Sequence, residues 1–235
     1  MPTAEITRKG ALLSNFQNIT ARIAAACARA GRDPAAVSVL AVTKYAADED
    51  VKLLEESGAV KIAGENKVQD ARAKWVDGAL APLRSRVELH FIGHLQTNKA
   101  KAAVETFDWI DCVDSVKIAA ELDRHAAAAG KTVPVMLQLK LNSSPAQSGV
   151  VPEQAGELLA AVRGFKNLHA RGYMGIAPAE GSPEELRAAF AKAKELFGRD
   201  FPEPGARLSL GMSGDYELAV EAGATLPRIG GSLFA

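Results

Sequence analysis

Short apolar runs alternate with longer helical stretches along almost the whole chain, and this alternation constrains the fold more than any other feature. We expect strands at residues 37–43, 60–63, 89–92, 109–113, 133–141, 168–173, 207–210 and 226–229. We expect helices at residues 48–58, 69–76, 97–106, 116–129, 152–163, 183–197 and 215–222. Strands that alternate with helices pair in parallel through right-handed crossovers.

The number of these units indicates the fold class. Eight strand-and-helix units in roughly 200 residues fit an α/β fold, a (β/α)8 barrel of the TIM type. A doubly wound open sheet produces a similar periodicity, so it stands as the alternative on pattern alone. No linker rich in proline, glycine and serine divides the chain. We therefore predict a single domain over residues 1–235.

An amphipathic helix is expected before the first strand. Phe16, Ile19 and Ile23 recur at three- and four-residue steps, which is the spacing of one helical face. We place this helix at about residues 3–30 and the barrel at about residues 37–235.

Charge and composition argue against several classes of protein. The 28 lysines and arginines balance 28 aspartates and glutamates, whereas a protein that binds nucleic acid through its overall field would be basic. No stretch approaches the roughly 18 apolar residues of a membrane span, and the first ten residues lack the apolar core of a signal peptide. Cys27 and Cys112 have no CxxC spacing, which favours a cytoplasmic protein with reduced thiols. Zero net charge without a coiled-coil heptad favours a monomer or weak dimer.

Lys44 is the first candidate for chemistry. Proteins of this fold collect their functional residues where strands end, at the C-terminal face of the barrel. A lysine that closes a buried apolar strand is unusual, because an ammonium group is costly to desolvate. Desolvation also makes a lysine amine a better nucleophile toward a carbonyl carbon. The alternative is a lysine whose ammonium simply reaches solvent from the strand end.

Polar residues also follow the second and third strands, with less specific meaning. Glu65 and Asn66 either face the site or cap the next helix. His90 and His94 are four residues apart, but a shared metal requires one helical face, and here a strand and Gly93 intervene. We therefore predict no metal site.

The last two strands end in residues suited to an anion. Met212, Ser213 and Gly214 follow the seventh strand, and Gly230 and Gly231 follow the eighth. Serine and glycines before a helix offer a hydroxyl and free backbone N–H groups, and barrels frequently bind phosphate after strands seven and eight. The same residues also suit tight turns and helix caps. They favour a phosphate site only when they are considered together with Lys44.

A lysine and a phosphate cradle on adjacent strands fit pyridoxal 5′-phosphate (PLP). Its aldehyde needs a lysine, and its phosphate needs an anion-binding loop. Arg228 is the strongly basic residue at that edge. Because arginine keeps its proton, it would donate to an unprotonated pyridine nitrogen and leave the ring a weaker electron sink.

The chain resembles the pyridoxal phosphate homeostasis proteins, the YggS/PROSC family, which is similar to the N-terminal barrel domain of alanine racemase (PLP fold type III). The resemblance is carried by AVTK, GENKVQ, HFIGHLQTNK, RGYM, LSLGMS and RIG, which occur in the family's order at residues 41–44, 64–69, 90–99, 171–174, 208–213 and 228–230. It extends over nearly the whole chain, and HFIGHLQTNK and LSLGMS are its specific parts.

The resemblance implies a role for each of eight residues. Lys44 would form a Schiff base with PLP, Ser213, Gly230 and Gly231 would hold the phosphate, Arg228 would face the pyridine nitrogen, and Asn66, Met174 and Met212 would line the pocket. It also implies no established turnover, a role in intracellular vitamin B6 and amino-acid balance, and PLP-dependent apoenzymes as recipients.

Two other functions are left open by the residues. One is a PLP-dependent amino-acid racemase. The other is a barrel enzyme without PLP, in which Lys44 reacts directly with a sugar-phosphate carbonyl. Bound PLP would colour the protein yellow, which separates the first two readings from the third.

Overall fold

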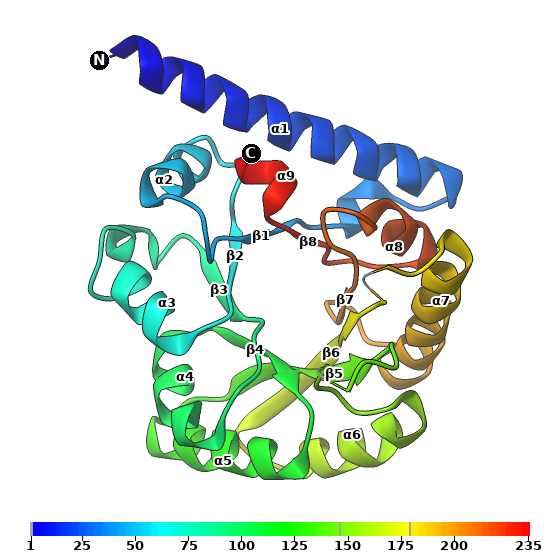
Figure 1. Ribbon diagram of the computed structural model, residues 1–235. Helices are drawn as coiled ribbons and strands as arrows, with labels where there is room; N and C mark the ends of the chain where they lie inside the picture. Colours follow the sequence, from blue (N-terminus) through cyan, green and yellow to red (C-terminus); the bar gives the residue numbers. More distant parts are fainter. Residues whose placement is uncertain (1, 146, 179) are drawn as a thin grey trace.

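Eight parallel strands follow one another around a barrel in the computed structural model, which describes residues 2–145, 147–178 and 180–235. The strands are β1 (Leu40–Val42), β2 (Ile62–Glu65), β3 (Glu88–Phe91), β4 (Trp109–Val113), β5 (Val133–Lys140), β6 (Leu168–Ile176), β7 (Arg207–Ser209) and β8 (Arg228–Ile229). The sheet order β7-β6-β5-β4-β3-β2-β1-β8 confirms the predicted barrel (Figure 1). It excludes the doubly wound sheet, in which the strand order reverses.

The barrel closes between β7 and β8 without a regular ladder. The backbone N–H of Thr225 donates to the carbonyl of Leu208 at 2.9 Å, and that of Arg228 donates to the carbonyl of Gly211 at 3.0 Å. Gly211 has a φ of 87°, and a Cβ there would lie 2.7 Å from the Cα of Tyr216. Glycine is therefore required where the chain turns from β7 toward β8.

Helices surround the barrel on its outer side. They are α1 (Pro2–Arg29), α2 (Asp48–Glu56), α3 (Val68–Trp75), α4 (Ala100–Thr106), α5 (Val116–Ala128), α6 (Ala155–Arg163), α7 (Pro183–Asp200), α8 (Tyr216–Ala222) and α9 (Gly231–Phe234), with 3-10 turns η1 (Pro34–Ala36), η2 (Ala81–Leu83), η3 (Thr97–Lys99) and η4 (Pro152–Gln154). The expected helices at 97–106 and 152–163 both begin as 3-10 turns. Neither η2 nor α9 is predicted by the sequence pattern. None of the helices in the described ranges could cross a membrane.

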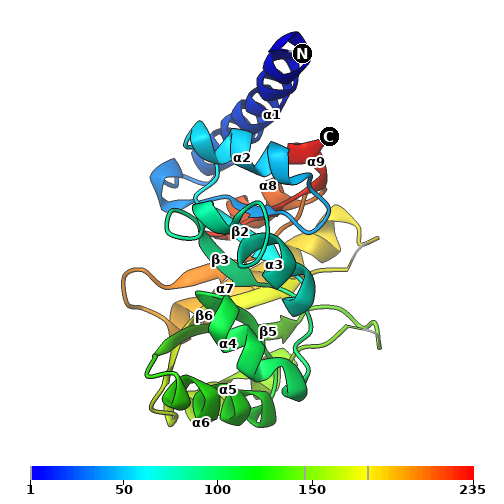
Figure 2. The same cartoon turned by 90° about the vertical axis from the view of Figure 1, so that its left-hand side faces the viewer.

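The N-terminal helix α1 covers β1 and β8 from outside, as Figures 1 and 2 show. Its buried side chains Leu12, Ile19 and Ile23 pack in one cluster with Ala41 of β1 and Ile229 of β8. The four-residue helix α9 adds Leu233 to the same cluster. The long N-terminal helix therefore supplies apolar cover for this side of the barrel.

The largest differences from the expected strand boundaries occur in β1 and β6. The strand expected at residues 37–43 is reduced to β1, because only residues 40–42 enter the ladders with β2 and β8. The strand expected at residues 168–173 continues to Ile176, because its partner β5 extends to Lys140 and the two ends pair. Met174, expected just beyond the sixth strand, therefore lies inside β6.

Candidate functional site

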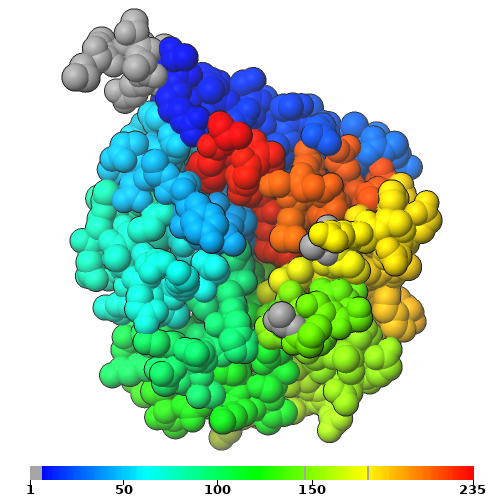
Figure 3. All heavy atoms as spheres, in the orientation of Figure 1, coloured from blue at the N-terminus to red at the C-terminus, as the bar shows by residue number. Residues whose placement is uncertain are grey.

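A cavity of about 790 Å³ opens at the C-terminal mouth of the barrel. Segments distant in the sequence meet around this mouth, which Figure 3 shows in space-filling form. Seven of the eight predicted site residues line the cavity: Lys44, Asn66, Met212, Ser213, Arg228, Gly230 and Gly231. The eighth residue, Met174, does not.

Met174 lies beneath the cavity. It is fully buried in β6, in register with Gln138 of β5 and Ser209 of β7. Ile176, two residues further along β6, does line the cavity. Because residues two apart point to the same side of a strand, the side chain of Met174 lies one layer deeper in the barrel.

Lys44 lies in the turn between β1 and α2 and is half-buried at the cavity wall. Its Nζ atom is 5.1 Å from the ring centre of Tyr45, whose own side chain is 88% exposed. A cation over an exposed ring is held weakly, by about 0.5–1 kcal/mol. The amine therefore stays free to turn into the cavity.

A second lysine, Lys74 of α3, fastens the turn that carries Lys44. Its Nζ donates to the carbonyls of Thr43 at 2.7 Å and Ala46 at 3.3 Å. The same Nζ lies 3.5 Å from Oε1 of the buried Glu65. Sequence reasoning missed this support, because nothing in the local pattern of α3 connects it to a turn about thirty residues earlier.

Glu65 and Asn66 take separate places, and neither caps a helix. Oε1 of Glu65 accepts hydrogen bonds from Thr43 Oγ1 at 2.7 Å and Trp75 Nε1 at 3.3 Å, between β2 and α3. Helix α3 starts at Val68 with no side-chain cap. Asn66, in contrast, lines the cavity, so the functional reading favoured by the resemblance applies to Asn66 alone.

Unpaired hydrogen-bond donors collect where β7 and β8 end. Across the described residues, the backbone N–H groups of Ser213, Gly214 and Gly231 enter no hydrogen bond. Ser213 Oγ accepts a long hydrogen bond, 3.5 Å, from the N–H of Ser232. A Cβ on Gly231 would point toward Ser213 Oγ, 3.9 Å away, and one on Gly214 would meet nothing. The two turns thus leave an open cradle lined by donors.

Arg228 forms part of the cavity wall from within the barrel and is only 5% exposed. Its guanidinium donates to Ser209 O at 2.8 Å, Ser209 Oγ at 3.0 Å and Gly175 O at 3.0 Å. All three acceptors are uncharged. Burial lowers the pKa of Arg228 to about 10, which keeps the group protonated at neutral pH. The cavity therefore has a fixed positive charge that no carboxylate contacts directly.

The two histidines of the HFIGHLQTNK segment are separated by the fold. His94 lines the cavity with its side chain 62% exposed, and its Nδ1 is 3.9 Å from Oδ2 of Asp114. His90 is buried inside the barrel. No cluster of three or more possible metal ligands occurs in the part of the chain that the structure describes. Sequence reasoning considered His94 only as a possible metal ligand together with His90, and did not place it in the cavity.

His90 belongs to a chain of alternating charges in the lower barrel. Its Nδ1 lies 2.7 Å from Asp111 Oδ2 and its Nε2 2.9 Å from Glu88 Oε1, while Arg207 donates to Glu88. Burial opposes a charge on the ring, but Asp111 and Glu88 overcome it and raise the pKa of His90. Trp109 stacks on the imidazole at 5.2 Å. The charged groups of this cluster thus contact one another, and only Oδ1 of Asp111 is left without a hydrogen-bond partner among the described residues.

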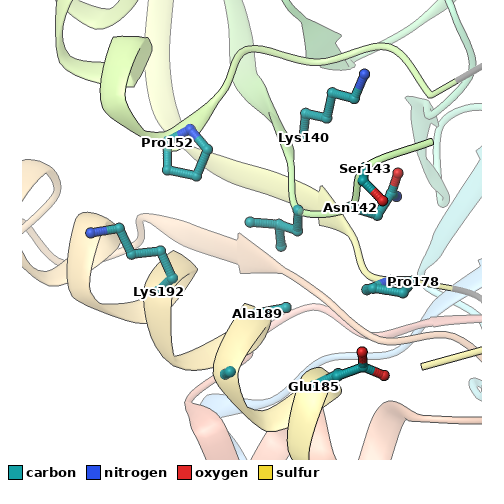
Figure 4. A pocket seen from close by; sticks show the side chains of 10 residues that line it. Lys140, Asn142, Ser143, Pro152, Pro178, Glu185, Ala189 and Lys192 are labelled. Carbon is teal, nitrogen blue, oxygen red and sulfur yellow. The ribbon is translucent and has the colours of Figure 1, made fainter. Parts of the chain in front are cut away.

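A second hollow, of about 500 Å³, lies outside the barrel between the segment after β5 and helix α7. Figure 4 shows Lys140 and Lys192 on opposite sides of it, with ammonium groups that point in different directions. Asn142, which lies beside Ser143, donates from its amide to the carbonyl of Ile176 at 3.0 Å. The polar groups of this hollow do not converge, so the mouth cavity is the better candidate site.

Comparison with known proteins agrees with this geometry. The family model of the alanine racemase N-terminal domain matches residues 14–235. The pyridoxal phosphate homeostasis protein of Pseudomonas aeruginosa is 37% identical over 223 residues, which are 95% of this chain and 94% of the relative.

Solved structures show the same fold over the whole chain. A protein of unknown function from Bifidobacterium adolescentis superposes with a TM-score of 0.89 at 29% identity, covering 97% of this chain and 96% of that one. PipY of Synechococcus elongatus, solved with PLP bound, gives a TM-score of 0.74 at 35% identity, covering 92% of this chain and all of that one. The chain therefore belongs to the alanine racemase N-terminal domain family, and its curated relatives there are the pyridoxal phosphate homeostasis proteins.

Proposed function

We propose that this protein binds PLP in the mouth cavity and holds it on Lys44 as part of intracellular PLP balance, without turning over a substrate. One observation carries the proposal: a free lysine, a buried arginine without a carboxylate partner and a cradle of unpaired N–H groups converge on a single cavity. PLP requires an amine, a ring-nitrogen partner and a phosphate site at once.

The residues present fit this cofactor. The unpaired N–H groups of Ser213, Gly214 and Gly231 and the hydroxyl of Ser213 are donors for phosphate oxygens, and a side chain at Gly231 would enter their space. Arg228 supplies N–H donors on the barrel side. The half-exposed rim residue Met212 and Asn66 border the space between the cradle and Lys44.

Each of these residues has a definite chemical role in binding. PLP, when bound, supplies an aldehyde that a lysine amine can engage as a Schiff base. Lys44 presents that amine at the cavity wall, and Lys74 fixes the turn beneath it. Because Arg228 can only donate a hydrogen bond, it would face an unprotonated pyridine nitrogen, and the ring would then be a weaker electron sink for carbanion chemistry. The uncharged acceptors around Arg228 hold its guanidinium in one orientation.

The open mouth supports a role in handing PLP on. Tyr45 and Met212 are exposed at the cavity edge, at 88% and 38%, so a bound molecule would stay within reach of solvent. PLP-dependent apoenzymes are the proposed recipients. Cys27 and Cys112 are both free and buried, which supports a reducing, cytoplasmic compartment.

The test is a visible spectrum with and without added PLP, followed by borohydride reduction and peptide mapping. We expect a yellow protein and a pyridoxyl mass on the peptide that contains Lys44. Lys44→Ala should lose both signals, and Lys99→Ala, which alters a lysine of the HFIGHLQTNK segment, is the matched control. An adduct on Lys67 or Lys99 would overturn the assignment of Lys44. A colourless protein that reacts with sugar phosphates would favour the enzyme without PLP.

A further inference from the structure

Arg8 of α1 joins the two segments on which the proposed function rests. Its Nε and Nη2 donate to the two oxygens of Asp50 at 3.0 and 2.7 Å. The same guanidinium donates to the main-chain oxygens of Phe234 at 2.8 Å and Ala235 at 3.1 Å. One side chain thus contacts α2 and the segment that follows β8.

Each contacted segment is the direct continuation of a cavity wall. Asp50 lies in the first turn of α2, which begins three residues after Tyr45 and so continues the turn of Lys44. Phe234 and Ala235 follow Gly230 and Gly231 within five residues, and they line the same cavity. Arg8 therefore lies at the point where the lysine side and the cradle side of the cavity are fastened together.

Asn15, about two turns further along α1, adds to this attachment. Its Nδ2 donates to the main-chain oxygens of Leu233 at 3.2 Å and Ala235 at 3.4 Å. Leu233 is fully buried in the same cluster as Leu12. The segment after β8 is otherwise a single helical turn, and so short a helix has little stability of its own.

We propose that Arg8, with Asn15, is a positioning residue that sets the spacing between the Lys44 turn and the phosphate cradle. A ligand that binds both sides at once depends on that spacing, whereas a ligand that binds only the lysine side does not. Guanidinium geometry suits the task, because its planar fork serves a carboxylate and two carbonyls together, which a lysine cannot reproduce. This inference rests on the proposed binding of PLP.

The experiment compares PLP with pyridoxal, which has the aldehyde but no phosphate. Dissociation constants for both are measured by absorbance titration on the full-length wild type, Arg8→Ala, Arg8→Lys and Asn15→Ala. We expect Arg8→Ala to weaken PLP binding about tenfold and pyridoxal binding less than about twofold, with Arg8→Lys nearly as impaired. Asn15→Ala should weaken PLP binding about threefold.

Arg22→Ala is the matched control, because Arg22 also pairs α1 with the barrel but through Glu217 of α8. It should leave both constants unchanged. Equal weakening of PLP and pyridoxal in Arg8→Ala, or no weakening of either, would overturn the inference while leaving the proposed function intact. If circular dichroism shows that Arg8→Ala does not fold, Asn15→Ala decides: its loss of affinity for PLP must exceed its loss of affinity for pyridoxal. Wild-type protein that binds no PLP would refute the proposed function itself, and this inference with it.

Discussion

The two polar regions of the barrel interior differ in whether their charged groups contact a group of opposite charge. In the lower barrel, His90, Glu88 and Arg207 bond one another in a closed chain of charges that ends at Asp111. At the mouth, Arg228 is buried without a carboxylate contact, and the adjacent turns expose unpaired N–H groups. Buried polar groups cost free energy unless they are paired. The lower cluster therefore leaves only Oδ1 of Asp111 without a hydrogen-bond partner among the described residues, whereas the unpaired donors and the lone guanidinium at the mouth point to a ligand.

Removing one carboxylate from the lower cluster should give the largest effect. In Asp111→Ala the buried His90 loses its 2.7 Å carboxylate partner, which favours the charged form of the ring. Removing one partner of a buried charged pair costs about 3–5 kcal/mol of unfolding free energy. Urea denaturation measures the loss, and the affinity for PLP is measured on the fraction that stays folded.

Asp114→Ala is the control for this change, since Asp114 belongs to the exposed His94 pair at the mouth. It should destabilise the fold by less than about 1 kcal/mol. If both variants unfold equally easily, the contrast between paired charges in the lower barrel and an open mouth is wrong.

Changes in the cradle should reduce affinity and spare stability. Ser213→Ala removes a hydroxyl from a charged ligand, worth about 1.5–3 kcal/mol of binding free energy for PLP. Gly231→Val should weaken PLP binding further, because the valine side chain would occupy the cradle. The fold should tolerate the change, because the nearest atom to the new Cβ, Ser213 Oγ, is 3.9 Å away. Titration with PLP and pyridoxal checks both. Tight binding of PLP by Gly231→Val would show that the phosphate binds outside this cradle.

Gly230→Val makes a different kind of change and sharpens this test. A Cβ at Gly230 would lie 3.2 Å from both the Cβ and the carbonyl oxygen of Val42. That substitution should therefore disturb the pairing of β8 with β1 and lower stability, as well as affinity. Of the two glycine substitutions, only Gly231→Val is expected to change the affinity for PLP without lowering stability.

Stability should depend on pH through the lower cluster. Burial works against ionisation of Glu88, but hydrogen bonds from His90 and Arg207 lower its pKa to about 2. Its contribution is thus complete above the pKa of the unfolded state, about 4.5, and is lost as the pH falls toward 2. The raised pKa of His90 acts oppositely: its contribution is complete below about 6.5 and declines as the pH rises through the folded value.

Urea unfolding from pH 2 to 9 should therefore show greatest stability from this cluster between about pH 4.5 and 6.5. In Glu88→Gln the loss of stability below about pH 4.5 should be smaller than in the wild type. An equally steep loss in that variant would assign the pH dependence to other carboxylates.

The sequence predicts the barrel and most of the site for a physical reason. Strand ends in a parallel barrel meet at one face, so Lys44, Ser213 and Gly230 are brought together by topology alone. Met174 shows the limit of this reasoning, because β6 continues past the expected end and places that side chain one layer deeper. An error of three residues at a strand end is enough to move a residue out of the cavity.

The supporting residues could not be predicted from pattern. Lys74, Asp111 and Arg8 each act on a segment far away in the sequence: Lys74 on the turn of Lys44, Asp111 on His90, and Arg8 on the end of the chain. On a helix or strand they look like ordinary surface or core residues. Their roles become visible only in the structure, where each side chain contacts a different helix or strand from its own.

The smallest expected effect is in amino-acid turnover, where we expect little or none. Racemisation requires an acid–base group on each face of the bound amino acid. Lys44 could serve one face, while Tyr173 donates to Asp200 at 2.7 Å outside the barrel and the side chain of Tyr216 is buried in the cluster under α1. His94 and Tyr45 also line the mouth cavity, but both side chains are mostly exposed. The assay follows α-hydrogen exchange of L-alanine in deuterated water and formation of the D-isomer. Turnover of about 1–10³ per second, abolished by Lys44→Ala and reduced by His94→Asn, would show that the mouth is a catalytic centre and not a binding site alone.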